Sequence, residues 1–181
     1  MLSRVTRRKE TKLSHWVTLV EKDVSFDPES SPETYHSLKQ ADYVGILAIT
    51  PSGRIPVIRQ FRPALERATW ELPGGLVDPN EEPSECCRRE LREEAGLVAR
   101  AIHHLASHPA EVGRLENLHH MYFVEAYEES DPTFEPEPNT EIKLVTRAEL
   151  DSQILDGAFD HPLHLALLYL FDLKFPQTRT R

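Results

Sequence analysis

Cysteine is scarce in this sequence, and long apolar runs are absent. The only two cysteines, Cys86 and Cys87, are adjacent, a spacing that supports neither a disulfide framework nor a structural zinc site. No segment approaches the roughly 18 consecutive apolar residues that a membrane-spanning helix needs. The basic start, MLSRVTRRKETK, leads into no apolar signal segment. We therefore expect a cytoplasmic protein with no membrane association.

Positive charge is also in short supply. The formal net charge is -9, and Lys and Arg form no long stripe beyond the first twelve positions. This charge balance argues against binding of long nucleic acids through the electrostatic field alone. The chain has 181 residues, of which 39% are hydrophobic and 28% charged. Such a chain is long enough to bury one core, with or without an extension.

Alternation of apolar and polar residues predicts a chain rich in strands with two helices. The turn sequence PSGR between two apolar runs predicts a β-hairpin. Pro83 and Gly96 suit the start and the end of a helix, and dense leucines predict a buried helix near the C-terminus. The expected strands are 15–26, 35–50, 55–61, 101–109, 118–128 and 142–146, the helices 83–96 and 160–175, and the loops 109–117 and 128–141. This order predicts a mixed α+β sandwich.

Three carboxylates share one face of the first predicted helix. With Glu90 at zero on a helical wheel, Glu94 lies at about 40° and Glu93 at about -60°. An apolar stripe at about 60° to 140° lies beside them and comprises Cys87, Leu91 and Ala95. This helix is therefore expected to bury one stripe and to present an acidic face next to it.

The acidic face is consistent with a bound cation. Like charges four residues apart, such as Glu90 and Glu94, destabilise a helix unless something cationic lies between them. Carboxylate oxygens without a nearby His or Cys favour Mg²⁺, or Mn²⁺, over zinc. The alternative interpretation is a solvated acidic face, with Arg88, Arg89 and Arg92 as ion-pair partners.

The spacing of this segment carries a family resemblance. Five residues separate Gly75 from Glu81, and seven more precede the run RELREEAGL at 89–97. The segment resembles the Nudix box at every fixed position. The resemblance implies an α/β/α sandwich with a mixed sheet, in which a loop, a helix and a loop hold divalent metal ions against a diphosphate. It also implies metal ligands at Glu90, Glu94 and the carbonyl of Gly74, a supporting ligand at Glu93, and a residue that orients the glutamates at Arg89.

The resemblance extends outside the box to the ADP-ribose pyrophosphatase branch, which hydrolyses nucleoside diphosphate sugars. The similar segments are WVTLVEKDVSFDPES, ETYHSLKQ, VIRQFRPAL and WELPGGLVD. The resemblance implies that Trp16 and Tyr35 stack on the base, that Arg62 approaches the phosphates, and that Leu76 lines the same pocket. The alternatives are a core-packing role for Trp16 and a surface salt bridge for Arg62.

The acidic loop that ends at Glu141 matches the place of a late glutamate in that branch. Glu141 is the expected general base or extra metal ligand, with Glu135 and Glu137 as second choices and a merely solvated loop as the alternative. ADP-ribose enzymes commonly carry a proline sixteen residues beyond the last box glycine, where this chain has Val112. The expected substrates are therefore nucleoside diphosphate sugars, with ADP-ribose as the leading member.

Two other functions remain open: a Nudix hydrolase acting on another dinucleotide or a capped RNA, and an inert domain that only senses a nucleotide. The resemblance implies a homodimer, with residues 1–43 as a strand region that forms a dimerisation arm and 44–181 as the Nudix hydrolase domain. Histidines also occur in adjacent pairs. We expect them to be ordinary strand residues, because strand neighbours point to opposite faces; they are His103, His104, His119 and His120.

Overall fold

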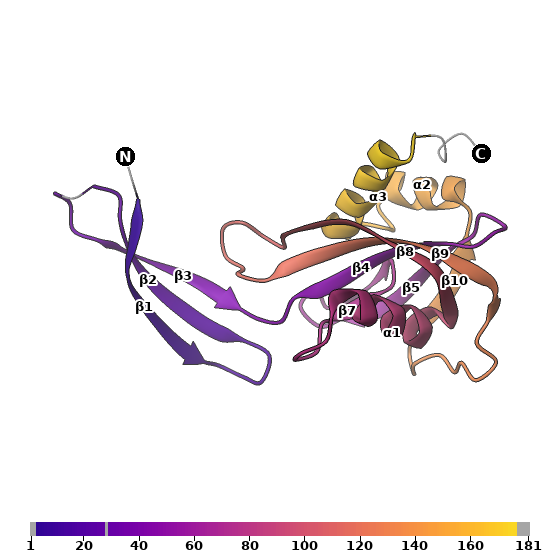
Figure 1. The fold of residues 1–181 in the computed structure, drawn as a ribbon, viewed down its shortest axis with the longest axis horizontal. Helices are drawn as coiled ribbons and strands as arrows, with labels where there is room; N and C mark the ends of the chain where they lie inside the picture. The colour runs from indigo at the N-terminus through magenta and orange to yellow at the C-terminus, as the bar shows by residue number, and fades with distance from the viewer. Residues whose placement is uncertain (1–2, 28, 177–181) are drawn as a thin grey trace. The chain divides into compact units, whose positions relative to one another are not determined.

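The computed structural model describes residues 3–27 and 29–176. The elements, in chain order, are β1 (Arg4–Lys12), β2 (Thr18–Ser25), β3 (Glu33–Lys39), β4 (Tyr43–Ile49), β5 (Ile55–Arg62), β6 (Arg67–Glu71), β7 (Gly74–Leu76), α1 (Pro83–Ala95), β8 (Leu97–Pro109), β9 (Leu118–Ser130), β10 (Glu141–Val145), α2 (Arg147–Leu155) and α3 (Pro162–Lys174) (Figure 1). The chain forms two compact units. The first comprises the residues up to Asp42 together with His108–Leu118, and the second comprises the remainder.

The first unit contains an antiparallel sheet of three strands in the order β1-β2-β3. The sequence pattern did not predict β1, because the segment RVTRRKETK has a single apolar side chain. Charges pair across the strands instead. Arg7 donates a hydrogen bond to Asp23 at 2.5 Å, and Lys9 forms an ion pair with the facing Glu21 at 2.7 Å. Opposite charges at facing positions stabilise a strand pair, so β1 forms without an apolar alternation.

The loop at 108–118 belongs to this first unit through its backbone. The Leu38 N–H donates to the carbonyl of Arg114 at 2.7 Å, and the Leu38 carbonyl accepts from the Glu116 N–H at 3.0 Å. Although burial opposes it, hydrogen bonds from Lys22, Ser37 and Arg8 lower the pKa of Glu116 to about 2. The first unit therefore consists of the N-terminal strands and this later loop, so it is not divided from the second unit by one boundary at residue 43.

The predicted hairpin around PSGR is wrong, although its turn is present. The Thr50 N–H donates to the carbonyl of Arg54 at 3.0 Å, and Gly53 has a φ of 76°. The flanking strands nevertheless enter different sheets, which have the orders β7-β4-β9-β8 and β10-β5-β6. β4 runs parallel to β9, and five of its seven residues are buried. A strand that is apolar on both faces is typical of a sheet covered on both sides.

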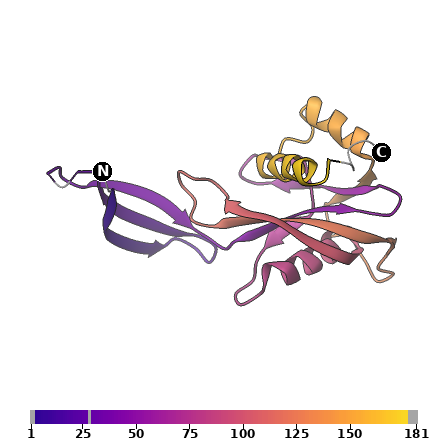
Figure 2. The ribbon, with the colours of Figure 1, turned by 45° about the horizontal axis from the view of Figure 1, so that its top comes forward.

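Helices cover both sides of the second unit (Figure 2). α1 packs on one apolar cluster through Cys87, Leu91 and Ala95, as the helical wheel predicts. α2 and α3 pack on a second cluster. α1 begins at Pro83 and ends before Gly96, which has a φ of 66°, so its predicted limits are confirmed. The mixed sheets and their helices form the expected α+β sandwich, and no described helix is long and apolar enough to cross a membrane.

Candidate active site

Arg89 holds the acids of α1 and of the preceding loop together. Its guanidinium donates to both carboxylate oxygens of Glu81 at 2.9 Å, to Glu90 at 2.6 Å and to Glu93 at 3.1 Å. These hydrogen bonds lower the pKa of Glu81 to about 2, with Arg89 as the main cause. Arg89 therefore lies where a residue that orients the glutamates is expected.

Glu94 is held from the other side, by the backbone. Its carboxylate accepts a hydrogen bond from the Gly74 N–H at 2.8 Å. Burial is the main cause that raises the pKa of Glu94 to about 8; the charges of Glu90 and Glu137 add to it, and Gly74 and Arg62 oppose it. A buried carboxyl between two other acids disfavours its own charge. A cation at this place would relieve that repulsion.

Two glycines permit the close approach of β7 to its neighbours. A Cβ atom at Gly75 would lie 2.1 Å from Oε1 of Glu90, and one at Gly74 would lie 2.2 Å from the carbonyl oxygen of Val44. At position 74 the clash is with backbone, so only glycine fits there, whereas a side chain at position 75 would have to push the Glu90 carboxylate aside. The absence of a side chain at Gly75 leaves the space that the carboxylate of Glu90 occupies.

The donor set suits a hard divalent cation. Glu90 and Glu94 offer carboxylate oxygens, the ligands that Mg²⁺ and Mn²⁺ prefer. Each is held separately, Glu90 by Arg89 and Glu94 by Gly74. Among the described residues, Glu90 and Glu94 do not belong to a group of three potential ligands whose ligand atoms all lie within 4.8 Å of one another. The chemistry of their oxygens fits such a cation.

Arg62 forms a buried ion pair with a residue that the sequence did not single out. Its Nε and Nη2 donate to the two oxygens of Glu71 at 2.8 and 2.5 Å, and Thr69 donates to the same carboxylate at 2.5 Å. Glu71 is only 1% exposed. Burial opposes its ionisation, but the bonds from Arg62 and Thr69 hold the pKa of Glu71 below its usual value. The Arg62 side chain stays 42% exposed and lies close enough to Glu94 for the two charges to interact.

The late acids occupy different surroundings. Glu141, at the start of β10, pairs with Lys143 at 2.8 Å and with Arg59 at 3.6 Å. These contacts lower the pKa of Glu141, with the hydrogen bond from Lys143 as the main cause. Glu137 is the acid of this loop whose charge acts on Glu94. The charge of Glu137 thus reaches Glu94, whereas Glu141 is engaged by Lys143 and Arg59.

The remaining expected ligand-binding residues are largely exposed. Trp16 lies in the turn between β1 and β2 and is 65% exposed. Its backbone N–H donates a hydrogen bond to the hydroxyl of Ser14 at 3.1 Å. Tyr35 on β3 packs edge-on against Phe26, with ring centroids 5.8 Å apart. Leu76 on β7 is also exposed. Trp16 therefore does not have the core-packing role that was its alternative in this chain.

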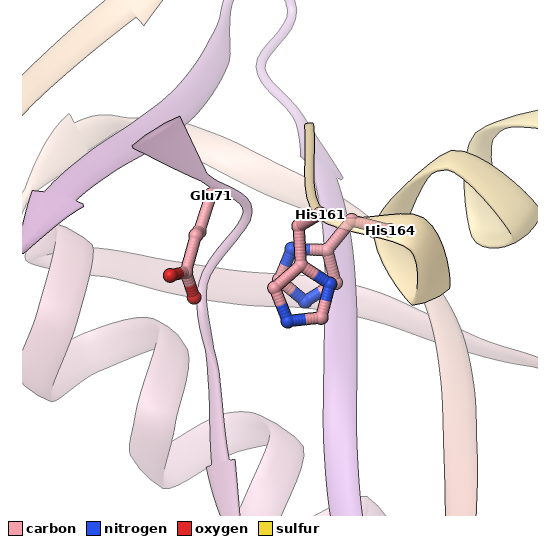
Figure 3. Close-up of side chains that lie close together, drawn as sticks. All are labelled: Glu71, His161 and His164. Carbon is pink, nitrogen blue, oxygen red and sulfur yellow. The ribbon is translucent and has the colours of Figure 1, made fainter. Parts of the chain in front are cut away.

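A buried imidazole cluster lies beside the Arg62–Glu71 pair. His161 and His164 stack at the start of α3, with ring centroids 3.9 Å apart (Figure 3). Each can offer a ring nitrogen within 4.8 Å of a Glu71 oxygen and of the other. No sequence pattern predicted this cluster. The spacing of two histidines at i and i+3 was the available signal, but no local pattern links them to Glu71, about ninety positions earlier in the chain.

The adjacent histidine pairs behave as strand geometry predicts. His103 stacks on Phe123 at 5.3 Å, whereas His104 lies beside Tyr122 on the opposite face. The pair at 119 and 120 likewise separates. His119 stacks on Tyr43 at 4.4 Å, and His120 bonds to the hydroxyl of Ser107. Neither pair converges on one point.

Residues 39–168 match the NUDIX domain family. The chain belongs to the Nudix family. The Nudix match includes α1, its acids and the segment with Glu71 and Gly74, but Trp16 and Tyr35 lie outside it. Family membership therefore bears on the acidic face and not on the residues expected to bind the base.

The names of individual relatives give different substrates. An ADP-ribose pyrophosphatase of Bacillus subtilis is 31% identical over 54% of this chain and 53% of its own length. A CMP-5'-(N-acetyl-N-hydroxy-3-aminopropyl)phosphonate hydrolase of Streptomyces rubellomurinus is 30% identical over 62% and 54%. The chain thus spans about half the length of these curated relatives.

The Nudix fold itself is supported over nearly the whole chain. A crystal structure of an ADP compounds hydrolase superposes with a TM-score of 0.79 at 19% identity, and the match covers 98% of this chain and 96% of that one. Similarity at this level of identity establishes the shared fold alone.

Proposed function

We propose that this Nudix protein hydrolyses the pyrophosphate bond of nucleoside diphosphate sugars, with ADP-ribose as the leading substrate. The products would be a nucleoside monophosphate and a sugar phosphate. One observation carries the proposal: the guanidinium of the half-exposed Arg62 lies close enough to Glu94, on the acidic face of α1, for the two charges to interact. A cation held by those acids and a guanidinium next to it form a combination suited to binding a diphosphate. The name of the Bacillus subtilis relative supports this substrate class.

Each residue of the site has its own role in the proposed reaction. Arg62 binds the phosphates, and Glu71 fixes the plane of its guanidinium through two parallel hydrogen bonds. Arg89 orients Glu90 and Glu93, while Gly74 orients Glu94 through its N–H and offers its carbonyl as a further ligand. A divalent cation, Mg²⁺ or Mn²⁺, would neutralise phosphoryl oxygens and lower the pKa of a bound water. Trp16 and Tyr35 stack on the base, and Leu76 lines the pocket.

A substrate panel tests the proposal directly. The purified protein is incubated with ADP-ribose, ADP-glucose, GDP-mannose and UDP-glucose, with and without Mg²⁺, and phosphate is measured after coupling to a phosphatase. We expect Mg²⁺-dependent release of AMP from ADP-ribose. Activity confined to dinucleotides or a capped RNA would favour the second enzymatic function. Nucleotide binding without turnover of any of these compounds would favour a sensing domain.

We also propose that the protein is a cytoplasmic homodimer whose N-terminal sheet docks on a partner subunit. All nine residues of β1 are exposed, and Trp16, Tyr35, Val5 and Phe26 are large exposed side chains of the first unit. A sheet with so little buried surface gains stability when another surface covers it. A crossing arm would bring Trp16 to the base site of the partner subunit.

In such a dimer, Trp16→Ala is expected to raise the KM for ADP-ribose by about tenfold, because stacking on a base contributes ~1–2 kcal/mol. The kcat should stay nearly intact, since Trp16 would contact the base and not the reacting phosphates. Steady-state kinetics measures both constants. Tyr169→Ala is the matched control, because Tyr169 is another exposed aromatic residue and lies on α3, outside the proposed base site. An unchanged KM would remove Trp16 from the base site.

Light scattering at several concentrations tests the assembly separately. The full chain should remain a dimer, and removal of residues 1–40 should abolish both the dimer and the activity. A monomer that retains full activity would contradict the shared site.

A further inference from the structure

His164 lies at the third position of α3 and points into the interior of the second unit. The side chain is only 3% exposed, and its Nδ1 accepts a hydrogen bond from the Leu72 N–H at 3.1 Å. His161, the residue that caps the same helix, stacks on it at an interplanar angle of 17° (Figure 3). α3 is therefore tied to the backbone that leads from β6 to β7.

That short backbone segment, Glu71 to Gly74, is held at several successive points. Glu71 receives the guanidinium of Arg62, Leu72 donates to His164, and Gly74 donates to Glu94. The carbonyl of Pro73 accepts from the Ile46 N–H at 2.9 Å. The proposed phosphate-binding residue and a proposed metal ligand are thus attached to opposite ends of one four-residue segment.

We propose that His164 is a positioning residue for the pyrophosphatase site, which fixes the segment Glu71–Gly74 through Leu72 and thereby sets Arg62 and Glu94 relative to each other. The inference rests on the proposed function. Small displacements of binding groups cost large factors in rate, because the reacting atoms must meet in a narrow range of geometry. An anchor in the middle of this segment restricts both of its ends at once.

The same three side chains, Glu71, His161 and His164, lie close enough together to suggest a metal site. The hydrogen bonds and protonation of His164 and Glu71 argue against it. A neutral imidazole has one lone pair, and that of His164 accepts the Leu72 N–H, so Nε2 carries the proton and cannot bind a metal ion. Both oxygens of Glu71 accept from Arg62, whose positive charge would repel a cation. The Nδ1 atom of His161 is buried without a hydrogen-bond partner among the described residues.

His164 is kept in the neutral form that this hydrogen bond needs. Burial lowers the pKa of His164 well below its usual value, and the neighbouring His161, His119 and Arg62 lower it further. Burial also lowers the pKa of His161, which faces His164 across the stack. At neutral pH both rings are therefore uncharged, and His164 can act only as the acceptor for Leu72 at Nδ1.

Two substitutions of His164 separate positioning from bulk packing. His164→Asn keeps an acceptor oxygen near the place of Nδ1, whereas His164→Leu keeps an apolar side chain and leaves the Leu72 N–H unpaired. We expect His164→Leu to lower kcat at least tenfold with a smaller change in KM, and His164→Asn to restore kcat to within about threefold of wild type. His161→Phe keeps the stacked ring without a nitrogen, and is the matched control with unchanged kcat.

Two further measurements do not depend on turnover. Mn²⁺ affinity, measured by electron paramagnetic resonance without substrate, should fall severalfold in His164→Leu and stay unchanged in His164→Asn, since Gly74 orients Glu94. Long-range ¹H–¹⁵N spectra of the wild-type protein should show His164 protonated at Nε2 and unprotonated at Nδ1. This tautomer can be observed even if His164→Leu fails to fold.

The outcomes are distinct. A His164 ring protonated at Nδ1, or a folded His164→Leu variant with wild-type kcat and Mn²⁺ affinity, would overturn the positioning role. Stoichiometric Zn²⁺ that shifts the ring signals of both His161 and His164 would show a metal site in its place. If the wild-type protein hydrolyses none of the panel substrates, the proposed function fails, while the Mn²⁺ and tautomer measurements still test the anchor.

Discussion

Glu94→Gln is expected to reduce kcat at saturating Mg²⁺ by at least about 100-fold, which corresponds to ~2.7 kcal/mol of barrier. Glutamine keeps the size of the side chain and an oxygen for the Gly74 N–H, but it loses the negative charge that holds a hard cation. The fold should survive. Burial raises the pKa of Glu94 to about 8, so the metal-free wild-type protein already carries a mostly neutral carboxyl there at pH 7.

The measurement is kcat across a Mg²⁺ titration, together with the Tm of the metal-free protein. Glu85→Gln is a suitable control, because Glu85 lies on the same helix, is 65% exposed and pairs only with Arg88 at 3.6 Å. Glu93→Gln should have an intermediate effect, since its exposed carboxylate bonds to Arg89. Turnover near the wild-type level in Glu94→Gln would remove Glu94 from the metal ligands.

The second large effect is expected at the late acid. The sequence match favours Glu141 as the general base or extra ligand, but in the structure it pairs with Lys143 and Arg59. Glu137 is an acid of the same loop whose charge, like that of Glu90, raises the pKa of Glu94. We therefore expect Glu137→Gln to lower kcat at least tenfold with little change in KM, because a base or an extra ligand acts mainly in the transition state.

Glu141→Gln and Glu135→Gln are the controls for this experiment. An exposed ion pair contributes at most about 1 kcal/mol, so Glu141→Gln should change kcat by no more than about fivefold. A large loss of kcat in Glu141→Gln alone would mean that the loop 128–141 rearranges when substrate binds and delivers Glu141 instead.

The sequence could predict α1 because everything that defines it is local. Pro83, Gly96 and the apolar stripe set its limits, and the spacing of its acids identifies the family. β1 lacked an apolar pattern, and its stability depends on facing charges in β2, which lie more than ten positions away. The pairing of β4 with β9 could not be predicted either. A strand that is apolar on both faces carries no signal for which strand lies beside it.

The active site shows the same division between local and distant information. The carboxylates on α1 follow from helical periodicity, because residues three and four apart share a face. The bond from Leu72 to His164 joins residues 92 positions apart, and the partner of Arg62 is a buried acid on the next strand. Such contacts depend on how the elements pack, and no pattern along the chain encodes them.

The close approach of Gly75 to Glu90 has a consequence for how this sequence can change. Any other residue at position 75 would place a Cβ atom where the Glu90 carboxylate now lies. Shortening position 90 to aspartate would relieve the clash but would withdraw the carboxylate from the acidic face. A side chain at position 75 would therefore have to displace the Glu90 carboxylate from the place where Arg89 holds it, so both positions are constrained by the same site. The two positions, fifteen apart in the chain, are therefore expected to be inherited together as one unit among descendants that keep the activity.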